Sequence, residues 1–186
     1  MPAGASSSLN ASVFGAKTII PANYLPETAS PGDEEEASRF AAACRKAEKI
    51  AERLIARAEQ NSFALALKLQ RRGFDAAVVK AVVSCLSEQR LLDDGRYAEL
   101  WIRSRLALKK APSPQWLLAA LGKRGVDRNL SAKAISAVLD PQTEYELLLR
   151  YVEQARFPLD KRVFSLRAQL KHEGFSSGAL DRYFDS

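Results

Sequence analysis

One phrase occurs three times in this chain, and its spacing constrains the fold more than any other feature. The phrase is a leucine, three further residues, a glycine and then phenylalanine or valine, and it occupies residues 69–74, 121–126 and 170–175. The glycines are 52 and 49 residues apart, and a second leucine precedes each glycine by eight residues. Self-similarity at such a period is typical of one supersecondary unit used repeatedly. The sequence therefore predicts an elongated body with a long contact surface rather than a single catalytic centre.

The segments around each phrase have apolar residues at helical spacing, and none shows the sustained alternation typical of a strand. A long helix, a short helix, a glycine turn and a third helix resemble the units that carry helix-turn-helix motifs. The predicted fold class is therefore all-α, with three tandem three-helix repeats forming an elongated, curved body. The expected units are residues 36–90, 91–139 and 140–186. Residues 1–35 are rich in Ser, Ala, Pro and Gly, and we interpret them as a flexible tail that ends in an acidic run.

Side chains suited to helix ends predict where the helices begin and end. The expected N-caps, all Ser or Asp, are Ser62, Asp75, Asp93 or Asp94, Ser113, Asp127, Asp140 and Ser176. The helix that begins at the Asp93-Asp94 pair is expected to run to about Lys110. The three repeated glycines follow short helices, so we expect each of them to have a positive φ.

Charge is unevenly distributed along the chain. The net charge is +6, but residues 1–36 carry −4 and residues 90–125 carry +5. A basic chain whose positive charge is concentrated in its middle is typical of a protein with a polyanionic partner. The alternative interpretation is a solvated surface that is rich in lysine and arginine.

Basic side chains recur at equivalent positions of the repeats, and they are the candidate contacts to DNA phosphates or to acidic groups of a protein partner. Two cations precede the glycine in the first and second copies, whereas the third copy has His172-Glu173 there. Four more lie in the second half of the long middle helix, where stabilisation of the helix dipole is the alternative explanation. The candidate binding residues are Arg71, Arg72, Arg103, Arg105, Lys109, Lys110, Lys123 and Arg124.

The residues that catalysis or metal binding would need are few and scattered. Cys44 and Cys85 form neither a disulfide framework nor a zinc-ligand pattern, and His172 has no nucleophile at a motif spacing. The Asp93-Asp94 pair suits a helix N-terminus better than a metal site. No phosphate-binding glycine loop, membrane-spanning run or secretory signal is visible. We therefore expect a cytoplasmic protein that is not an enzyme and needs no cofactor or metal.

Residues 90–106 resemble the RecX family of recombinase regulators. The family's Leu-Asp-Asp-x-Arg-aromatic-Ala stretch falls on residues 92–98, and its Ser-Arg pair falls on Ser104-Arg105. Residues 121–126 are similar to the family's Leu-x-x-Lys-Gly-Ile phrase, with one additional basic residue. Two positions depart from the pattern: Leu65 stands where a glutamate is expected, and residues 111–114 replace a Gly-Pro-like junction. The resemblance extends from about Arg45 to the C-terminus.

The resemblance implies an all-helical modulator of the RecA recombinase. Proteins of this family bind RecA filaments on DNA, lie in the helical groove of the filament and typically inhibit ATP hydrolysis and strand exchange. The expected partners are therefore the RecA filament and, through it, single-stranded or duplex DNA, and we expect a monomer. Direct binding of DNA through helix-turn-helix units is the alternative function. Arg105, as the arginine of the Ser-Arg pair, has a second interpretation as a structural partner of Asp93 or Asp94.

Overall fold

The computed structural model describes residues 31–155 and 163–185, and within these ranges the chain forms nine α-helices and no β-strand. In chain order the helices are α1 (Pro31–Arg57), α2 (Ser62–Gln70), α3 (Ala76–Glu88), α4 (Asp94–Leu106), α5 (Pro114–Gly122), α6 (Arg128–Val138), α7 (Pro141–Ala155), α8 (Val163–His172) and α9 (Ser177–Phe184).

Helix α1 begins earlier than the sequence indicates. Its expected start is residue 36, but the helix begins at Pro31, with Asp33 and Glu34 in its first turn. A proline is tolerated there because the first helical N–H has no intrahelical partner, and carboxylates favour the positive end of the helix dipole. Residues 31–35 are therefore helical rather than part of a tail, and the rest of the expected tail, residues 1–30, lies outside the described residues.

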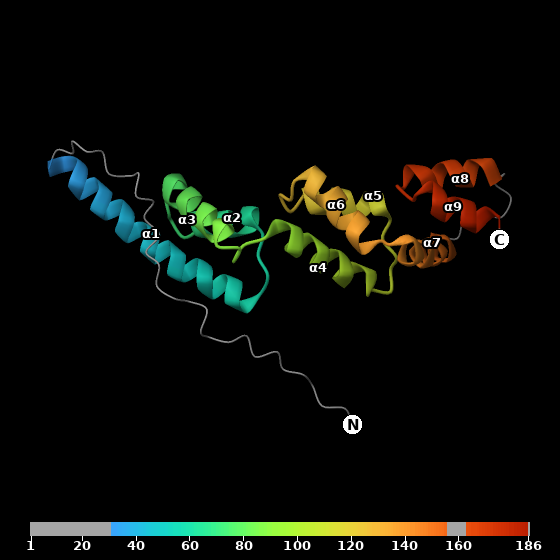
Figure 1. The fold of residues 1–186 in the computed structure, drawn as a ribbon, viewed down its shortest axis with the longest axis horizontal. Coiled ribbons are helices and arrows are strands. Elements are labelled where there is room, and N and C mark those ends of the chain that lie inside the picture. The colour runs from blue at the N-terminus through green and yellow to red at the C-terminus, as the bar shows by residue number, and fades with distance from the viewer. Residues whose placement is uncertain (1–30, 156–162, 186) are drawn as a thin grey trace, which may run out of the picture.

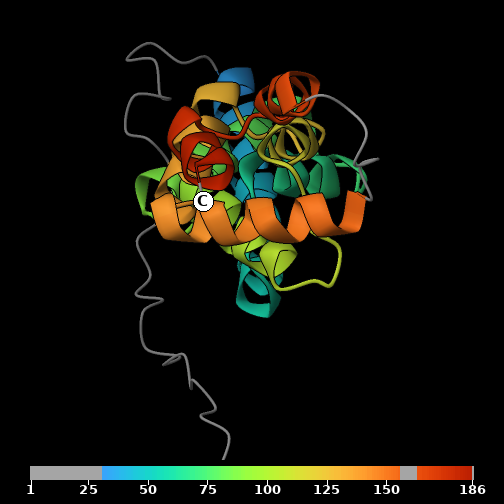
Figure 2. The ribbon, with the colours of Figure 1, turned by 90° about the vertical axis from the view of Figure 1, so that its right-hand side faces the viewer.

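The helices pack as three consecutive units, α1–α3, α4–α6 and α7–α9. In each unit the third helix contacts both the first and the second. Figure 1 shows the units following one another along the long axis, and Figure 2, which looks along that axis, shows that the body is narrow in cross-section. The predicted fold class, an elongated all-α body of tandem three-helix repeats, is confirmed.

The repeated phrase forms the turn that ends each short second helix. Gly73, Gly125 and Gly174 have φ values of +84°, +78° and +90°, which glycine adopts at little energetic cost. The amide after each glycine donates to the carbonyl oxygen of the leucine five residues before it, at 3.4, 3.2 and 3.3 Å. This is the Schellman pattern of helix termination. Because these three leucines are fully buried, the phrase specifies both the turn and the core residue beside it, and the predicted positive φ values are confirmed.

Most of the helix N-termini are capped by the side chains that the sequence indicates. Oxygens of these caps accept hydrogen bonds from backbone amides in the first turns of α4, α5, α6, α7 and α9; the caps are Asp93, Ser113, Asp127, Asp140 and Ser176. Each such bond satisfies an amide that would otherwise lack an intrahelical partner.

One of the predicted caps is wrong, and another is confirmed in position only. Helix α2 is capped by Asn61, whose Oδ1 accepts from the amide of Ala64 at 2.7 Å. Ser62 is the first helical residue instead, and its amide and hydroxyl donate to the carboxylate of Asp94 at 2.7 and 2.5 Å. Asp75 occupies the N-cap position of α3 but makes no capping hydrogen bond through its side chain. Asn61 and Ser62 are both good caps, and the contact with Asp94, 32 residues away, decides between them.

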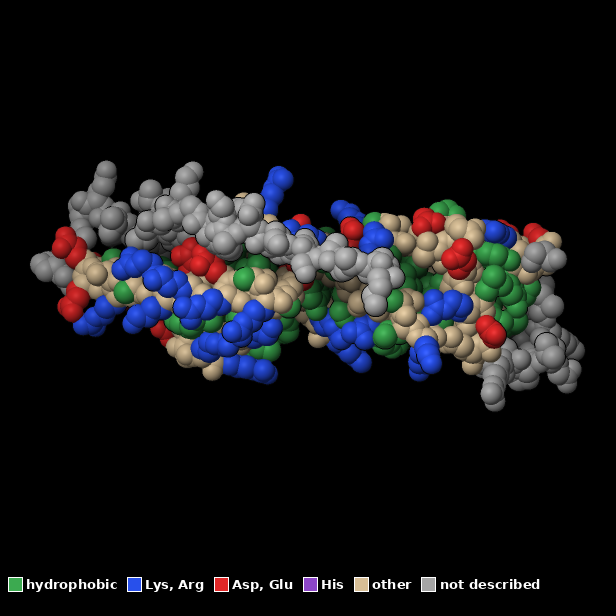
Figure 3. Space-filling model, turned by 90° about the horizontal axis from the view of Figure 1, so that it is seen from below, with side chains coloured by type: hydrophobic (Ala, Val, Ile, Leu, Met, Phe, Trp, Pro, Cys, Tyr) green, Lys and Arg blue, Asp and Glu red, His purple; other side chains and the backbone are tan. Residues whose placement is uncertain are grey.

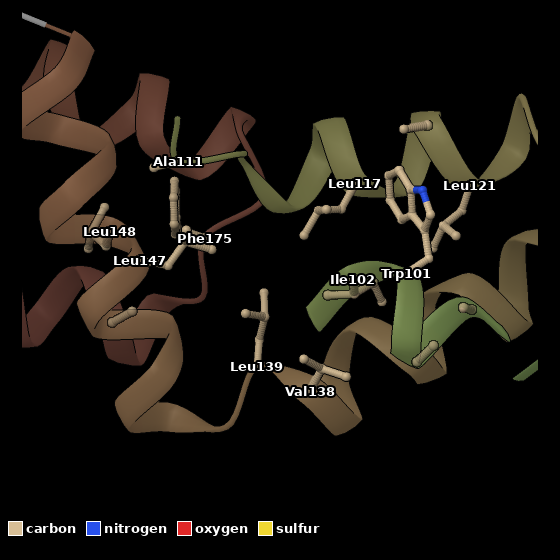
Figure 4. Close-up of a cluster of buried hydrophobic side chains, with 14 of the residues drawn as sticks. Trp101, Ile102, Ala111, Leu117, Leu121, Val138, Leu139, Leu147, Leu148 and Phe175 are labelled. Atoms are coloured by element: carbon tan, nitrogen blue, oxygen red, sulfur yellow. The ribbon is translucent and has the colours of Figure 1, made fainter. Parts of the chain in front are cut away.

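The buried apolar side chains form two clusters. One lies within the first unit, around Leu65, Leu69 and Leu86. The other is continuous through the second and third units, and Figure 4 shows it extending from Trp101 on α4 to Leu148 on α7. The second and third units therefore share one apolar core, whereas the first unit has its own.

Both junctions between units use the glycine turn of the later unit. At the first junction, Asn61 Nδ2 donates to the carbonyl oxygen of Arg124 at 2.8 Å. At the second, the amide of Gln115 donates to the carbonyl oxygen of Glu173 at 2.9 Å. Each acceptor immediately precedes a repeated glycine, so the same turn that ends a short helix also joins that unit to the preceding one.

The glycines at these junctions also allow a close approach. A Cβ atom at Gly125 would lie 2.2 Å from Cγ of Phe63 on α2, and one at Gly174 would lie 3.1 Å from the amide nitrogen of Gln115 on α5. A Cβ at Gly73, which follows the first unit's short helix, would meet no atom of the described residues within 4 Å. The glycine is therefore needed for its φ in all three repeats, and for close packing only where a unit precedes it.

Candidate binding surface of the middle repeat

Helix α4 ends earlier than the sequence indicates. It was expected to run to about Lys110 but ends at Leu106, and a loop of residues 107–113 follows. Arg103 and Arg105 lie in the last turn of the helix, whereas Lys109 and Lys110 lie in the loop. The expectation that these four cations occupy one long helix is therefore wrong.

Side chains of α7 hold this loop in place. Arg150 donates to the carbonyl oxygens of Leu106 and Leu108, at 3.0 and 2.6 Å. Gln154 donates to the carbonyl of Lys109 at 2.7 Å and accepts from the amide two residues later at 2.8 Å. These bonds satisfy polar backbone groups where the helix ends. They come from more than forty residues away, so local helix propensity gives no sign of them.

The arginines that immediately precede the first two repeated glycines have a structural role. Nη1 of Arg72 and of Arg124 donates to the carbonyl oxygen four residues earlier, at 2.9 and 2.8 Å. Each arginine therefore satisfies an acceptor in the last turn of its short helix. Their neighbours, Arg71 and Lys123, are exposed and are the members of each pair that are available to a partner.

The two arginines of α4 differ in their surroundings. Arg103 lies 3.9 Å from the Glu99 carboxylate, and both side chains are more than 40% exposed, so this ion pair contributes little to stability. Arg105 makes no such pair with a carboxylate of the described residues. Its predicted alternative role, as a partner of Asp93 or Asp94, is wrong, because the Asp93 carboxylate caps its own helix and that of Asp94 binds the start of α2.

Arg105 lies instead on the ring of Trp101. Its guanidinium carbon is 5.1 Å from the ring centroid, and that of Arg124 is 4.4 Å away. A second indole, that of Trp116, stacks on Trp101 with 6.0 Å between centroids and 21° between planes. Guanidinium groups are attracted to the negative face of an indole ring. Two cations thus lie beside the Trp101 ring, and Nε of Arg105 is buried with no hydrogen-bond partner in the part of the chain that the structure describes.

A cleft of about 450 Å³ opens beside this stack, where the middle and third units meet. Trp116 and Leu108, each about half exposed, provide apolar surface, and Arg105 and Lys110 provide positive charge. Tyr151 of α7 forms part of the lining.

Glu173 is the carboxylate of this lining. Burial raises the pKa of the Tyr151 hydroxyl, and the charge of Glu173, to which it is hydrogen-bonded, raises it further. The carboxylate of Glu173 is therefore already engaged with a neighbour from α7.

The structure thus separates the predicted binding residues into groups. Arg105 and Lys110 line the cleft, and Arg124 joins Arg105 on Trp101. Lys109, in the loop after α4, and Lys123, just after α5, are exposed. Arg71 and Arg72 follow α2 in the first unit, and they neither line the cleft nor lie on Trp101.

A second group of cations, on α1, was not among the residues predicted from the sequence. All of its members are exposed, and none pairs with a carboxylate among the described residues; they are Arg45, Lys46, Lys49, Arg53 and Arg57. Four of the five recur every fourth residue, so they follow one side of the helix for about 18 Å. Figure 3 shows lysine and arginine side chains gathered over this end of the body. The spacing of four is the signal that would have identified them.

The described residues offer little for catalysis. They contain no group of three His, Cys, Asp or Glu side chains placed to hold a metal ion. Burial raises the pKa of the Cys44 and Cys85 thiols, which lowers the fraction of reactive thiolate. His172 is exposed at the end of α8. In the described part of the chain, no helix has the length and apolar character that crossing a membrane requires.

Fold and surface together define an elongated α-helical repeat protein with exposed cations and an aromatic cleft between two of its units. Comparison with known proteins identifies the family. A family model described as the second three-helix domain of RecX matches residues 93–135. The regulatory protein RecX of Treponema pallidum (strain Nichols) is 39% identical over 127 residues, which cover 68% of this chain and 77% of the relative. The regulatory protein RecX of Halorhodospira halophila is 34% identical over 145 residues, covering 75% and 87%. The chain belongs to the RecX family of regulatory proteins.

Two solved structures share the fold. The crystal structure of RecX from Lactobacillus salivarius superposes with a TM-score of 0.59 at 18% identity, covering 78% of this chain and 96% of the other. A second crystal structure of a regulatory protein RecX gives a TM-score of 0.64 at 20% identity, covering 87% and 81%. At these identities the likeness shows the helical repeat architecture alone.

Proposed function

We propose that this protein binds filaments of the RecA recombinase on DNA and inhibits ATP hydrolysis and strand exchange by RecA. Membership of a family of regulatory proteins supports a regulatory role. The observation that carries the proposal is the elongated row of repeats, whose exposed cations recur on α1 and in the middle unit. Many weak contacts distributed along such a body add up when it binds a long, regular partner. We further propose that it acts in the cytoplasm as a monomer and needs no cofactor.

Three lysines of the middle unit are the residues best placed to test this. Lys109, Lys110 and Lys123 are exposed and pair with no carboxylate among the described residues. Exposed charges of this kind contribute about 0–1 kcal/mol to folding, so their reversal to glutamate leaves the fold intact. Arg105 and Arg124 are excluded because both stack on Trp101 and one of them also caps α5.

The test is inhibition of DNA-dependent ATP hydrolysis by RecA, measured at several salt concentrations. The triple variant Lys109→Glu, Lys110→Glu and Lys123→Glu is expected to inhibit weakly and to lose about one unit of salt slope per phosphate contact. The matched control reverses three exposed lysines elsewhere, Lys80, Lys133 and Lys171, so that both variants have the same net charge. Full inhibition by the triple variant at every salt concentration would rule out the basic middle as the binding face.

A second candidate function is direct binding of DNA, which the group of exposed cations on α1 favours. A protein that neutralises phosphates of bare duplex loses affinity steeply as salt rises, because each contact releases condensed counterions. Titration of naked duplex and of RecA-coated DNA with the same protein separates the two functions. Tight, strongly salt-dependent binding to the naked duplex supports direct action, whereas a strong preference for coated DNA supports the filament.

A further inference from the structure

We propose that the cleft beside Trp116 binds one unstacked base of single-stranded nucleic acid, with the adjoining phosphate held by Arg105 and Lys110. This site goes beyond the proposed function, because it needs no recombinase, and beyond direct binding of duplex DNA, because it assigns one cleft to a single unstacked base. The single-stranded form is required because a base within a duplex is already stacked on both faces and cannot enter a cleft.

The aromatic wall of the cleft is rigid and open. Trp116 stacks on the largely buried Trp101 with 6.0 Å between the ring centroids, yet half of the surface of Trp116 is exposed. Its helix is fixed at the N-terminus by Ser113, whose hydroxyl accepts from the Trp116 amide at 3.1 Å, and by the proline that follows Ser113. An exposed, immobilised indole is a stacking platform that every base can use, because every base has a π-face.

The cations of the cleft are free to bind a phosphate. Neither Arg105 nor Lys110 forms an ion pair with a described residue. The guanidinium carbon of Arg105 lies 5.1 Å from the centroid of the Trp101 ring, and the planar N–H groups of a guanidinium suit phosphate oxygens. The carboxylate of the lining, Glu173, is engaged with Tyr151, and the two cations outnumber it.

The size and composition of the cleft favour a nucleotide over a peptide. Its volume, about 450 Å³, lies within the roughly 300–1,000 Å³ typical of small-ligand sites. An apolar peptide side chain would use Leu108 and the indole but would leave both cations unpaired. A base with its phosphate uses the aromatic face and the cations together, which is the combination found in proteins that bind single strands.

The chain provides its own probe for this site. Its two tryptophans are Trp101, 8% exposed, and Trp116, 50% exposed, so a base stacked in the cleft quenches mainly the second. The full-length protein is titrated, without RecA, with a twelve-residue oligothymidylate and with an abasic oligonucleotide that has the same number of phosphates. We expect quenching by the thymidylate only, and about tenfold tighter binding of it than of the abasic strand.

Three variants assign the effect to the cleft. Trp116→Leu is expected to abolish the preference for the base-containing strand and to leave abasic binding and its salt slope unchanged, whereas Trp116→Phe keeps most of the preference. Lys110→Gln is expected to lower the salt slope by about one unit and to retain the quenching. The control is Phe63→Leu, which alters a similarly exposed aromatic side chain on α2 outside the cleft. It is expected to change neither the preference for the base-containing strand nor the salt slope. Circular dichroism confirms that each variant is folded.

Two results would overturn the proposal. One is equal affinity for the thymidylate and the abasic strand in the unaltered protein; the other is an undiminished preference in folded Trp116→Leu. If Trp116→Leu abolishes inhibition of RecA but has no effect on binding of the oligonucleotide, the cleft takes a protein segment and the inference fails while the proposed function stands. Conversely, base-dependent binding without any inhibition of RecA would support the cleft and refute the proposed function.

Discussion

Replacing Gly125 by alanine tests whether the repeated glycine turn joins the units as well as ending a helix. Gly125 has φ of +78°, and a Cβ atom there would lie 2.2, 2.5 and 2.6 Å from Cγ, Cβ and Cδ1 of Phe63. Rotation about χ1 of Phe63 can move Cγ and Cδ1 but not Cβ. The backbone of α2 or of the turn must therefore shift, and the two units must separate at this junction.

The expected loss of stability has two parts. An L-residue in the left-handed region costs roughly 1–2 kcal/mol, and alanine recovers about 0.4–1 kcal/mol of that by restricting the unfolded chain. Forcing additional atoms into a packed contact costs about 1–3 kcal/mol. We expect Gly125→Ala to lower the free energy of unfolding by about 1–4.5 kcal/mol, the sum of the net backbone effect and the clash.

Gly73→Ala is the matched control. Gly73 has φ of +84° in the equivalent turn, but a Cβ atom there would meet no atom of residues 31–155 or 163–185 within 4 Å. The backbone effect and the change in the unfolded chain are shared, so the difference between the two variants isolates the clash. Replacing Phe63 by glycine removes the whole side chain and should relieve the clash. A double-mutant cycle of Phe63→Gly with Gly125→Ala is therefore expected to show a coupling of about 1–3 kcal/mol.

The measurement is urea unfolding followed by circular dichroism at 222 nm, with the slope of each transition compared between variants. Equal losses for Gly125→Ala and Gly73→Ala would refute the reasoning. The contact with Phe63 would then impose no constraint on the junction, and the glycine would be required only for its backbone conformation.

Three further results are expected. Asn61→Ala removes both the cap of α2 and the bond to the next unit, and should lower the free energy of unfolding in urea by roughly 2–3 kcal/mol. Arg150→Met releases the carbonyls at the end of α4, so trypsin should cleave the loop 107–113 faster in the otherwise folded protein. The hydrogen bond from the Leu130 amide lowers the pKa of Asp127 below its usual value. Its stabilising effect is therefore present above about pH 4 and is lost as the pH falls through the lowered pKa, and Asp127→Asn should flatten this acid limb of the unfolding free energy.

The repeat architecture could be predicted because the repeated residues act locally. The leucine, the glycine and the apolar residue after it lie within six positions of one another, and together they specify a helix end, a positive φ and a core side chain. Asp93, Ser113 and Asp127 likewise act within three or four residues of themselves. Interactions of such short range leave a pattern in the sequence that can be interpreted without a partner segment.

Two of the errors arose where a distant residue decides the outcome. Helix α4 stops at Leu106 because Arg150 and Gln154, on a helix of the next unit, bind the backbone of the loop that follows. Ser62 does not cap α2 because its hydroxyl and amide donate hydrogen bonds to the carboxylate of Asp94. Neither outcome is visible in the helix propensity of the segment concerned.

The candidate cleft depends on what the repeats do not share. Arg72 and Arg124 occupy equivalent positions and cap their helices in the same way, but only Arg124 also meets a tryptophan. Both tryptophans of the chain are in the middle unit, and there they bring Arg105 and Arg124 to one ring. Charge counting along the sequence found both arginines, and the Ser-Arg pair indicated a structural alternative for Arg105 as a partner of Asp93 or Asp94, but nothing in the sequence indicated that the two arginines share a tryptophan ring. Because repeated residues are accounted for by the fold, the unrepeated aromatic pair of the middle unit is where a specialised contact of this protein is to be sought.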